Sequence, residues 1–212
     1  MDITWYGHNC FRITERGRIT IVTDPFNDDV IGLPAPKIKG DVVTISEATP
    51  FNNNVDTVKG QSYVLAGPGE YELGGVFIYG LALHNPETAR HNVAYTVQYD
   101  NSLTLLHLGN LSHVPDQSTI EAFGEVNIAL VPVGNGANLT AAQAAEVIAL
   151  IEPNYIVPMQ YAIPGLTVNV DPVEKFLKEM GVSKVQEEDI LRVTGSILPE
   201  QPQVVLLKPQ EG

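Results

Sequence analysis

Histidine is the side chain most often used as a metal ligand and as an acid–base catalyst near neutral pH. The chain has five of them, His8, His84, His91, His107 and His113. None is spaced as in the HxH, HxxxH or HExxH patterns that hold zinc, so the histidines alone predict no local metal motif. For each histidine taken by itself, a structural role is the more economical interpretation.

Other motifs that carry chemistry are equally weak. The chain contains no GxSxG nucleophile elbow and no GxxxxGK[ST] phosphate-binding loop. The Gly67-Pro68-Gly69 run predicts a tight turn, and we expect Glu70 and Glu72 beside it to be solvated surface residues. Cys10 is the one cysteine, which excludes an internal disulfide and any zinc site built from several thiolates. Local motifs therefore identify no active site.

Composition narrows the class of protein. Hydrophobic residues make up 44% of the 212 residues, which is ample for a core, and charged residues make up 17%. Twelve Lys and Arg against 25 Asp and Glu leave a formal net charge of −13. Nucleic acids and anionic membrane surfaces are bound through basic residues, so we expect neither as a partner.

The beginning of the chain, MDITWYGHNC, has no basic segment followed by an apolar one, so we expect no secretory signal. No window approaches 18 uninterrupted apolar residues, which excludes a membrane-spanning helix of the usual kind. These observations predict a cytoplasmic protein. Without a low-complexity linker or an internal repeat, residues 1–212 are expected to form one α/β domain.

The first hundred residues predict mainly strands and the second half predicts alternating strands and helices. Thr140 and Gln143 form a capping box, so a helix should begin there and end before Pro153. A second helix is expected after Asp171 as its cap, with Gly181 as its end. The strands are predicted at residues 3–6, 10–13, 19–22, 41–46, 63–66, 75–83, 93–99, 126–133, 155–159 and 203–207.

Several segments together resemble the metallo-β-lactamase fold. They are ITWYGHNCFRI with VTDPF, GPGEYELGGVFIYGLALHN, LLHLGNLSH, VNIALVPVGN and IVPMQY, in that order along the chain. The chain is most similar to the compact zinc-dependent hydrolases that resemble ascorbate-6-phosphate lactonase, from residue 1 to about residue 165. The resemblance implies a four-layer αββα sandwich with a metal site at one edge, between the two sheets.

The same resemblance implies metal ligands that this chain largely lacks. Family members carry His-x-His-x-Asp-His after the fourth predicted strand, and the corresponding positions here include Glu47, Thr49, Phe51 and Asn52. A later histidine of the family aligns with His84, which is kept. A bridging aspartate corresponds to Asn110, and a last histidine to Gln160. One of the seven ligand positions therefore keeps its family residue.

Loss of the ligands changes the expected function. Water is a poor nucleophile near neutral pH until a metal lowers its pKa, so the family's hydrolysis would lack its nucleophile. We therefore expect a pseudoenzyme, a binding or scaffold protein that holds no metal or other cofactor. Its partner would be an unidentified small molecule or protein, and it could form a homo-oligomer. The alternative is a divergent hydrolase of esters, lactones or phosphoesters that holds one zinc or a rebuilt site through Glu47, His84 and an amide or another histidine.

The remaining polar side chains define the expected pocket, namely His8, Glu47, His84, Asn110, His113 and Gln160. Glu47 with a histidine could also make an acid–base site without metal. At the altered motif we expect packing and capping in place of metal chemistry. Phe51 should be at least partly buried, and Asn52, Asn53 or Asn54 should cap the following short helix through its side chain.

Overall fold

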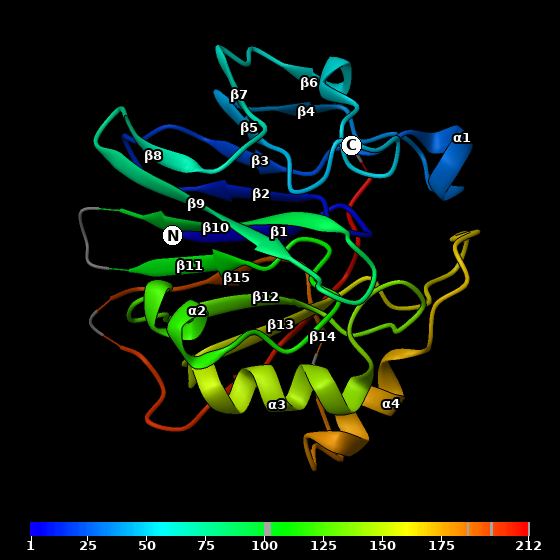
Figure 1. Ribbon diagram of the computed structural model, residues 1–212. Coiled ribbons are helices and arrows are strands. Elements are labelled where there is room, and N and C mark those ends of the chain that lie inside the picture. Colours follow the sequence, from blue (N-terminus) through cyan, green and yellow to red (C-terminus); the bar gives the residue numbers. More distant parts are fainter. Residues whose placement is uncertain (100–102, 186, 196, 212) are drawn as a thin grey trace.

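A computed structural model describes residues 1–99, 103–185, 187–195 and 197–211. Two mixed β-sheets face each other in it, and helices lie outside them (Figure 1). The six-stranded sheet has the order β15 (Leu191–Arg192), β1 (Asp2–Trp5), β2 (Phe11–Thr14), β3 (Ile21–Thr23), β5 (Val42–Thr44) and β7 (Tyr63–Leu65). The seven-stranded sheet has the order β16 (Gln203–Val204), β13 (Tyr155–Met159), β12 (Ile128–Pro132), β11 (Thr104–His107), β10 (His91–Gln98), β9 (Val76–His84) and β8 (Gly69–Leu73).

Smaller elements complete the described part of the chain. Two short ribbons pair β4 (Ile38–Lys39) with β6 (Val58–Lys59) and β14 (Glu187–Glu188) with β17 (Leu206–Leu207). The helices are α1 (Asp28–Ile31), α2 (Gln117–Ala122), α3 (Ala141–Ile151), α4 (Val173–Glu179) and the 3₁₀ turn η1 (Val55–Thr57). Figure 1 shows α3 and α4 below β12 and β13, on the outer side of the seven-stranded sheet.

Each sheet has a parallel part, and these parts decide where the site lies. Strands β3, β5 and β7 are parallel in one sheet, and β11, β12, β13 and β16 are parallel in the other. The remaining pairs within these two sheets, among them the β8–β9–β10–β11 meander, are antiparallel. Because parallel strands end at the same edge of a sheet, the loops that follow them gather there.

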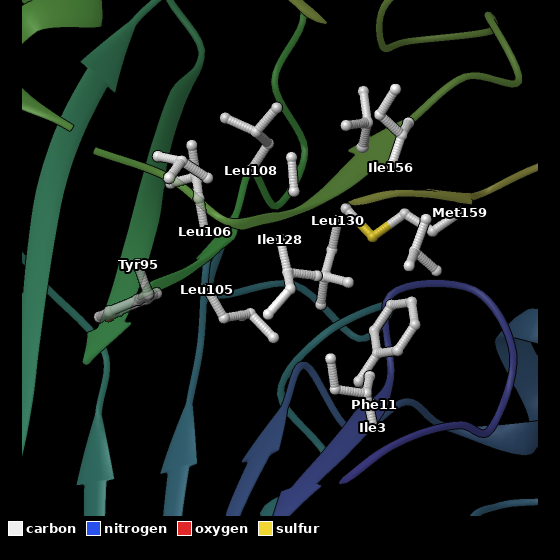
Figure 2. Packing of buried hydrophobic residues seen from close by; sticks show 14 of the residues in the cluster. Ile3, Phe11, Tyr95, Leu105, Leu106, Leu108, Ile128, Leu130, Ile156 and Met159 are labelled. Carbon is white, nitrogen blue, oxygen red and sulfur yellow. The ribbon is translucent and has the colours of Figure 1, made fainter. Parts of the chain in front are cut away.

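The main core lies between the two sheets. Figure 2 shows Ile3 and Phe11 of the six-stranded sheet opposite Leu105, Ile128 and Leu130 of the seven-stranded sheet. All five side chains are completely buried. Burial of apolar area at roughly 25 cal/mol per Å² makes this layer the main source of stability.

The outer layers of the sandwich are unequal. On the seven-stranded sheet, α3 packs Ala144, Val147 and Ile148 inward. On the six-stranded sheet, the one-turn helix α1 and the β4–β6 ribbon cover a second, smaller apolar cluster that contains Phe26 and Ile31. The αββα prediction is therefore confirmed, with one outer layer reduced to a turn of helix and a ribbon.

Sequence patterns locate most elements but miss the short ones. The capping box at Thr140 forms as predicted, and the strand at residues 155–159 is observed with the same bounds. The cap predicted for α4 is wrong, because Pro172 occupies that position and Asp171 Oδ1 accepts a hydrogen bond from Lys175 Nζ at 2.7 Å. Neither α1, α2 nor β8 was predicted, since each is short or rich in Gly and acidic residues.

Within the described residues, no helix combines the length and apolar character needed to cross a membrane.

Candidate functional site

Polar side chains gather where the parallel strands of both sheets end. Asp24 follows β3, and Glu47 lies three residues beyond β5. In the opposite sheet Asn110 follows β11 and Gln160 follows β13 directly. The loops between these strands and their neighbours thus bring together residues that are far apart in sequence.

Asn110 is the centre of this cluster. Its Oδ1 accepts hydrogen bonds from Asn9 Nδ2 at 2.8 Å and from Gln160 Nε2 at 2.5 Å. Its Nδ2 donates to Glu47 Oε2 at 2.9 Å and to Asn52 Oδ1 at 3.1 Å. Both donors of the amide and both acceptor positions of its oxygen are therefore used. One neutral side chain ties together four loops of the site.

Side-chain hydrogen bonds also hold the backbone around Asn110. Asn92 Oδ1 accepts from the Asn110 N–H at 2.8 Å, and Asn92 Nδ2 donates to the Leu108 carbonyl at 2.8 Å. Gly109 has a φ of 60°, and a Cβ there would lie 2.4 Å from Ser46 Cβ. Only glycine fits this turn, so the approach of the β11 loop to the β5 loop requires Gly109.

Glu47 is held by a cation of the protein itself. Arg90 lies just before β10, and its guanidinium donates to Glu47 Oε2 at 2.8 Å. The guanidinium also donates to the Ala137 carbonyl in the loop after β12. Both charged side chains are more than two-thirds buried, with exposures of 21% for Glu47 and 29% for Arg90. The charge of Glu47 is thus balanced inside the site.

Behind this pair lies a completely buried carboxyl group, that of Asp24. Ser46 donates to it twice, from its N–H at 2.7 Å and from its Oγ at 2.5 Å, and Asn9 Nδ2 donates at 3.4 Å. Burial raises the pKa of Asp24 to about 7, although these hydrogen bonds and the nearby Asn52 amide oppose the rise. The Asp24 carboxyl group is therefore partly protonated near neutral pH.

A cavity of about 230 Å³ opens beside the cluster. Its wall includes His8, Thr49, Phe51 and Asn110 together with Arg90, the loop at residues 135–138 and residues 168–170. Burial lowers the pKa of His8 to about 4, so its ring is neutral at pH 7. Because Glu47 and Arg90 balance each other, the wall offers mainly neutral donors, acceptors and apolar surface.

The structure brings most of the predicted pocket residues together, but not all. His8, Glu47, Thr49, Phe51, Asn52 and Asn110 line the cavity, and Gln160 contacts it through Asn110 and Asn138. His84 and His113 are not part of the cavity wall. His84 lies opposite His91 across the β9–β10 pair, with ring centroids 4.7 Å apart. Burial, and to a smaller extent electrostatic interaction with His84, lower the pKa of His113.

The altered motif behaves only in part as expected. The side chain of Phe51 is 38% exposed, so most of its surface is covered, but it is not buried. Its ring centroid lies 6.3 Å from that of His8. The predicted asparagine cap is wrong. Asn54 precedes η1 without a side-chain capping bond, and Asn52 is completely buried and bonded to Asn110. The Asn52 amide therefore accepts a hydrogen bond within the site and does not cap η1.

Unusual backbone conformations concentrate at this edge. Six described residues other than glycine have a positive φ, and His8, Asp24, Asn135 and Gln160 are four of them. Such conformations cost of order 1–3 kcal/mol each and persist where the surroundings impose them. They cluster at active sites and ligand clamps, so the edge has the backbone geometry of a functional site.

Several residues of the site escaped the sequence analysis. Arg90 stands in a loop with no motif around it, and nothing in the sequence indicates that it reaches Glu47. Asp24 had a signal, because VTDPF ends a predicted strand with a carboxylate before proline. Asn135 and Asn138 had a weaker one, since both closely follow the strand at residues 126–133.

The two-metal centre that the resemblance implies does not fit these residues. Three of the positions that would supply imidazoles or carboxylates, namely Asn52, Asn110 and Gln160, hold amides that bond to one another. A cation beside Glu47 would face the Arg90 guanidinium. No group of three His, Cys, Asp or Glu side chains is arranged for a metal anywhere in the described ranges. The Asn110 amide is fully hydrogen-bonded and the charge of Glu47 is balanced by Arg90, which opposes binding of a divalent cation.

Comparison with known proteins gives consistent matches. The model of the beta-lactamase superfamily domain matches residues 2–160. A UPF0173 protein of Pyrococcus furiosus is 28% identical over 204 residues, covering 85% of this chain and 90% of that protein. A UPF0173 metal-dependent hydrolase of Koribacter versatilis is 24% identical over 225 residues, covering 88% and 95%. A solved structure of a metallo-β-lactamase superfamily protein from Thermotoga maritima has a TM-score of 0.80 and 32% identity, and the match covers 97% of each chain.

Proposed function

Since the chain belongs to the beta-lactamase superfamily, a family whose members include metal-dependent hydrolases, we propose that it is a member that binds a small molecule without hydrolysing it. The superfamily and its fold were both predicted from the sequence, and both are confirmed. The binding role concerns the cavity at the strand ends, where the hydrolases of the family would hold metal.

The observation that carries the proposal is the closed hydrogen-bond set around Asn110. A metal ligand must turn a lone pair toward the cation, but the Asn110 oxygen already accepts from Asn9 and Gln160. Glu47, the one carboxylate among the replaced positions, accepts from both Arg90 and Asn110. Binding a cation would break these bonds and place it against a fixed positive charge.

What remains is suited to recognition. A cavity of about 230 Å³ accommodates a molecule of modest size. Neutral amides and the neutral His8 can pair with polar groups of a ligand, and Phe51 offers an aromatic face. Pockets of this kind are mostly apolar with a few placed polar groups that fix orientation. A neutral polar molecule fits the balanced charge of the wall best.

The second candidate, a hydrolase with one metal at Glu47, His84 and Gln160, finds less support. His84 is not part of the cavity wall, and Gln160 is bonded to Asn110 through its nitrogen. Catalytic zinc generally has three protein ligands and an open position. Glu47 alone offers an anionic group there, and Arg90 neutralises it.

Restoring the ligands tests the proposal from one side. The sixfold variant Glu47→His, Thr49→His, Phe51→Asp, Asn52→His, Asn110→Asp and Gln160→His should bind zinc or manganese, while the unmodified protein should not. A matched control keeps Asn110 and changes the other five positions, and it should bind metal at least about tenfold more weakly because the bridging carboxylate is missing. Isothermal titration with each metal measures this. Equal metal binding by the unmodified protein would contradict the proposal.

Blocking the cavity tests it from the other side. Thr49→Trp places a large side chain in the cavity wall, whereas Thr88→Trp adds the same group at an exposed position away from it. A screen of neutral metabolites by thermal shift should give ligands that stabilise the unmodified protein and the Thr88 variant. The Thr49 variant should lose that stabilisation. Ligands that stabilise all three proteins equally would place binding elsewhere and contradict the proposal.

A further inference from the structure

A second feature of the molecule lies on the outer face of β8, β9 and β10, remote from the strand-end cavity. The strand register aligns two rows across this face. Glu72, Phe77 and Gln98 form one row, and Glu70, Tyr79 and Thr96 form the other. A shallow groove of about 440 Å³ runs over these rows and reaches Ala122 at the end of α2. Figure 1 shows β8 at the edge of the sheet that lies away from α3 and α4.

The groove exposes aromatic surface. Phe77 is 55% exposed although its strand is paired on both sides, and Tyr79, two residues along, is half-buried. Long apolar side chains on an open sheet face are uncommon in proteins that act alone, and contiguous patches of them mark interaction sites. Phe77 and Tyr79 lie two residues apart on β9, so their rings form one stripe along the strand.

The edge of the sheet beside this stripe is open. In the described part of the chain, β8 pairs with β9 on one side and with no strand on the other. Gly74 and Gly75, with φ values of 55° and 74°, form the two-residue turn that connects the paired residues Leu73 and Val76. Residues of an antiparallel pair alternate in hydrogen bonding, so Glu70 and Glu72 are those whose backbone N–H and C=O point away from β9.

The charges at this edge have one sign. Glu70 and Glu72 are both exposed, and neither takes part in an ion pair with any described residue. Charged side chains, proline or a bulge commonly protect edge strands from pairing; β8 contains no proline, so its two glutamates are the residues that deter a partner without positive charge. A second copy of the chain would bring two more glutamates and a net charge of −13 to the same edge. A partner with positive charge fits the edge, and a second copy does not.

We propose that this face binds an extended, basic segment of a partner protein, which pairs antiparallel to β8 as an added strand. Side chains directly opposite one another in such a pair lie on the same face. Lysine or arginine side chains at alternate positions would therefore lie beside Glu70 and Glu72, and their aliphatic stems and charges would cover Phe77 and Tyr79. The intervening residues would pack near Tyr71 and Leu73. Main-chain pairing supplies affinity, and the alternate charges supply selectivity.

The binding test uses a fluorescein-labelled peptide of sequence KVKVKV, blocked at both ends, with the full chain at low ionic strength. Fluorescence anisotropy should show binding that the E70Q/E72Q variant weakens about tenfold. The matched control E187Q/E188Q removes two exposed glutamates from β14 and therefore has the same net charge as E70Q/E72Q. It should change affinity less than about twofold. Phe77→Ser should also weaken binding several-fold, whereas Tyr63→Ser, at a similarly exposed aromatic residue of β7, should not.

Amide exchange measured by NMR separates strand addition from simple charge attraction. On addition of the peptide, the N–H groups of Glu70 and Glu72 should exchange more slowly, while those of Glu187 and Glu188 should not change. Equal loss of affinity in both double variants, or no protection at residues 70 and 72, would overturn the proposal. So would a peptide-free dimer, seen by analytical ultracentrifugation, that Phe77→Ser converts to monomer, because the face would then serve a second copy. Unchanged melting temperatures of the variants confirm that they are folded.

Discussion

The interior between the sheets and the edge where the parallel strands end are both buried, but they are built in opposite ways. Between the sheets, the side chains of Phe11, Leu105, Ile128 and Leu130 are completely buried members of one apolar cluster. At the edge, the buried amide of Asn110 is instead hydrogen-bonded to four neighbouring side chains. The first region tolerates exchange of one apolar residue for another of similar volume. The second depends on the identity of every neighbour.

This difference explains how the fold can persist while the ligands of a metal centre are replaced. The stability of the sandwich comes from non-directional apolar burial that involves no ligand position. At the edge, removal of one member leaves its partners unsatisfied, so the replacements form a mutually bonded set. Asn52, Asn110 and Gln160 illustrate this, because each occupies a ligand position and bonds to another of the three.

The largest effect on stability should come from the inter-sheet region. Phe11→Ala removes a completely buried ring from contact with Trp5 and His107 and should lower the free energy of unfolding by about 3–5 kcal/mol. Urea unfolding followed by circular dichroism measures the change. A loss below about 1 kcal/mol would show that the layer between the sheets is not the main source of stability.

A smaller loss is expected at the centre of the polar cluster. Asn110→Ala leaves Gln160 Nε2 without the acceptor seen here, and should cost about 2 kcal/mol because water from the adjacent cavity can replace part of the set. The exposed Asn53→Ala should cost less than about 0.5 kcal/mol. If both variants unfold at the same urea concentration as the unmodified protein, the cluster does not depend on Asn110.

The buried carboxyl group predicts a pH dependence of definite sign. The pKa of Asp24 is about 7 in the folded protein, above its ordinary value of 3.8, so folding favours its protonated form. Its contribution therefore weakens the folded state progressively as pH rises from about 4 to about 7. Relative to the unmodified protein, Asp24→Asn should gain melting temperature between pH 4.5 and pH 8. His8, whose pKa is lowered to about 4, changes stability in the opposite direction but is common to both proteins. A difference in melting temperature that is constant with pH would be inconsistent with a raised pKa.

The smallest effect is expected for the ion pair. Glu47→Gln keeps an oxygen for Arg90 and Asn110 while removing the charge, and should change the free energy of unfolding by about 0.2–1 kcal/mol. Salt should weaken the unmodified protein by a similar amount. A loss of several kcal/mol would indicate that Arg90 is left as an uncompensated buried charge, which would place Glu47 among the residues that hold the fold together.

How far the sequence predicts this molecule depends on the range of the interactions. The Thr140 capping box and the apolar strand at residues 155–159 are local patterns, and both are observed as predicted. The resemblance located Glu47, Asn110 and Gln160, which three-dimensional contacts then unite. Arg90 could not be found this way, because its partner Glu47 lies 43 residues earlier and no spacing rule links them. His84 shows the opposite kind of error: the resemblance aligned it with a ligand position, but it does not line the cavity.

Metal content is the measurement that tests the central claim most directly. The protein and the sixfold ligand-restored variant should be purified without chelator and dialysed. Their zinc, manganese and iron content is then measured by inductively coupled plasma mass spectrometry. We expect the unmodified protein to hold well under one equivalent of all three metals, and the restored variant to hold at least about one, because Asn110 and its neighbours bond to one another in the former. One or more tightly held metals in the unmodified protein, lost when Glu47 and Gln160 are replaced by alanine, would contradict the account and favour the divergent hydrolase.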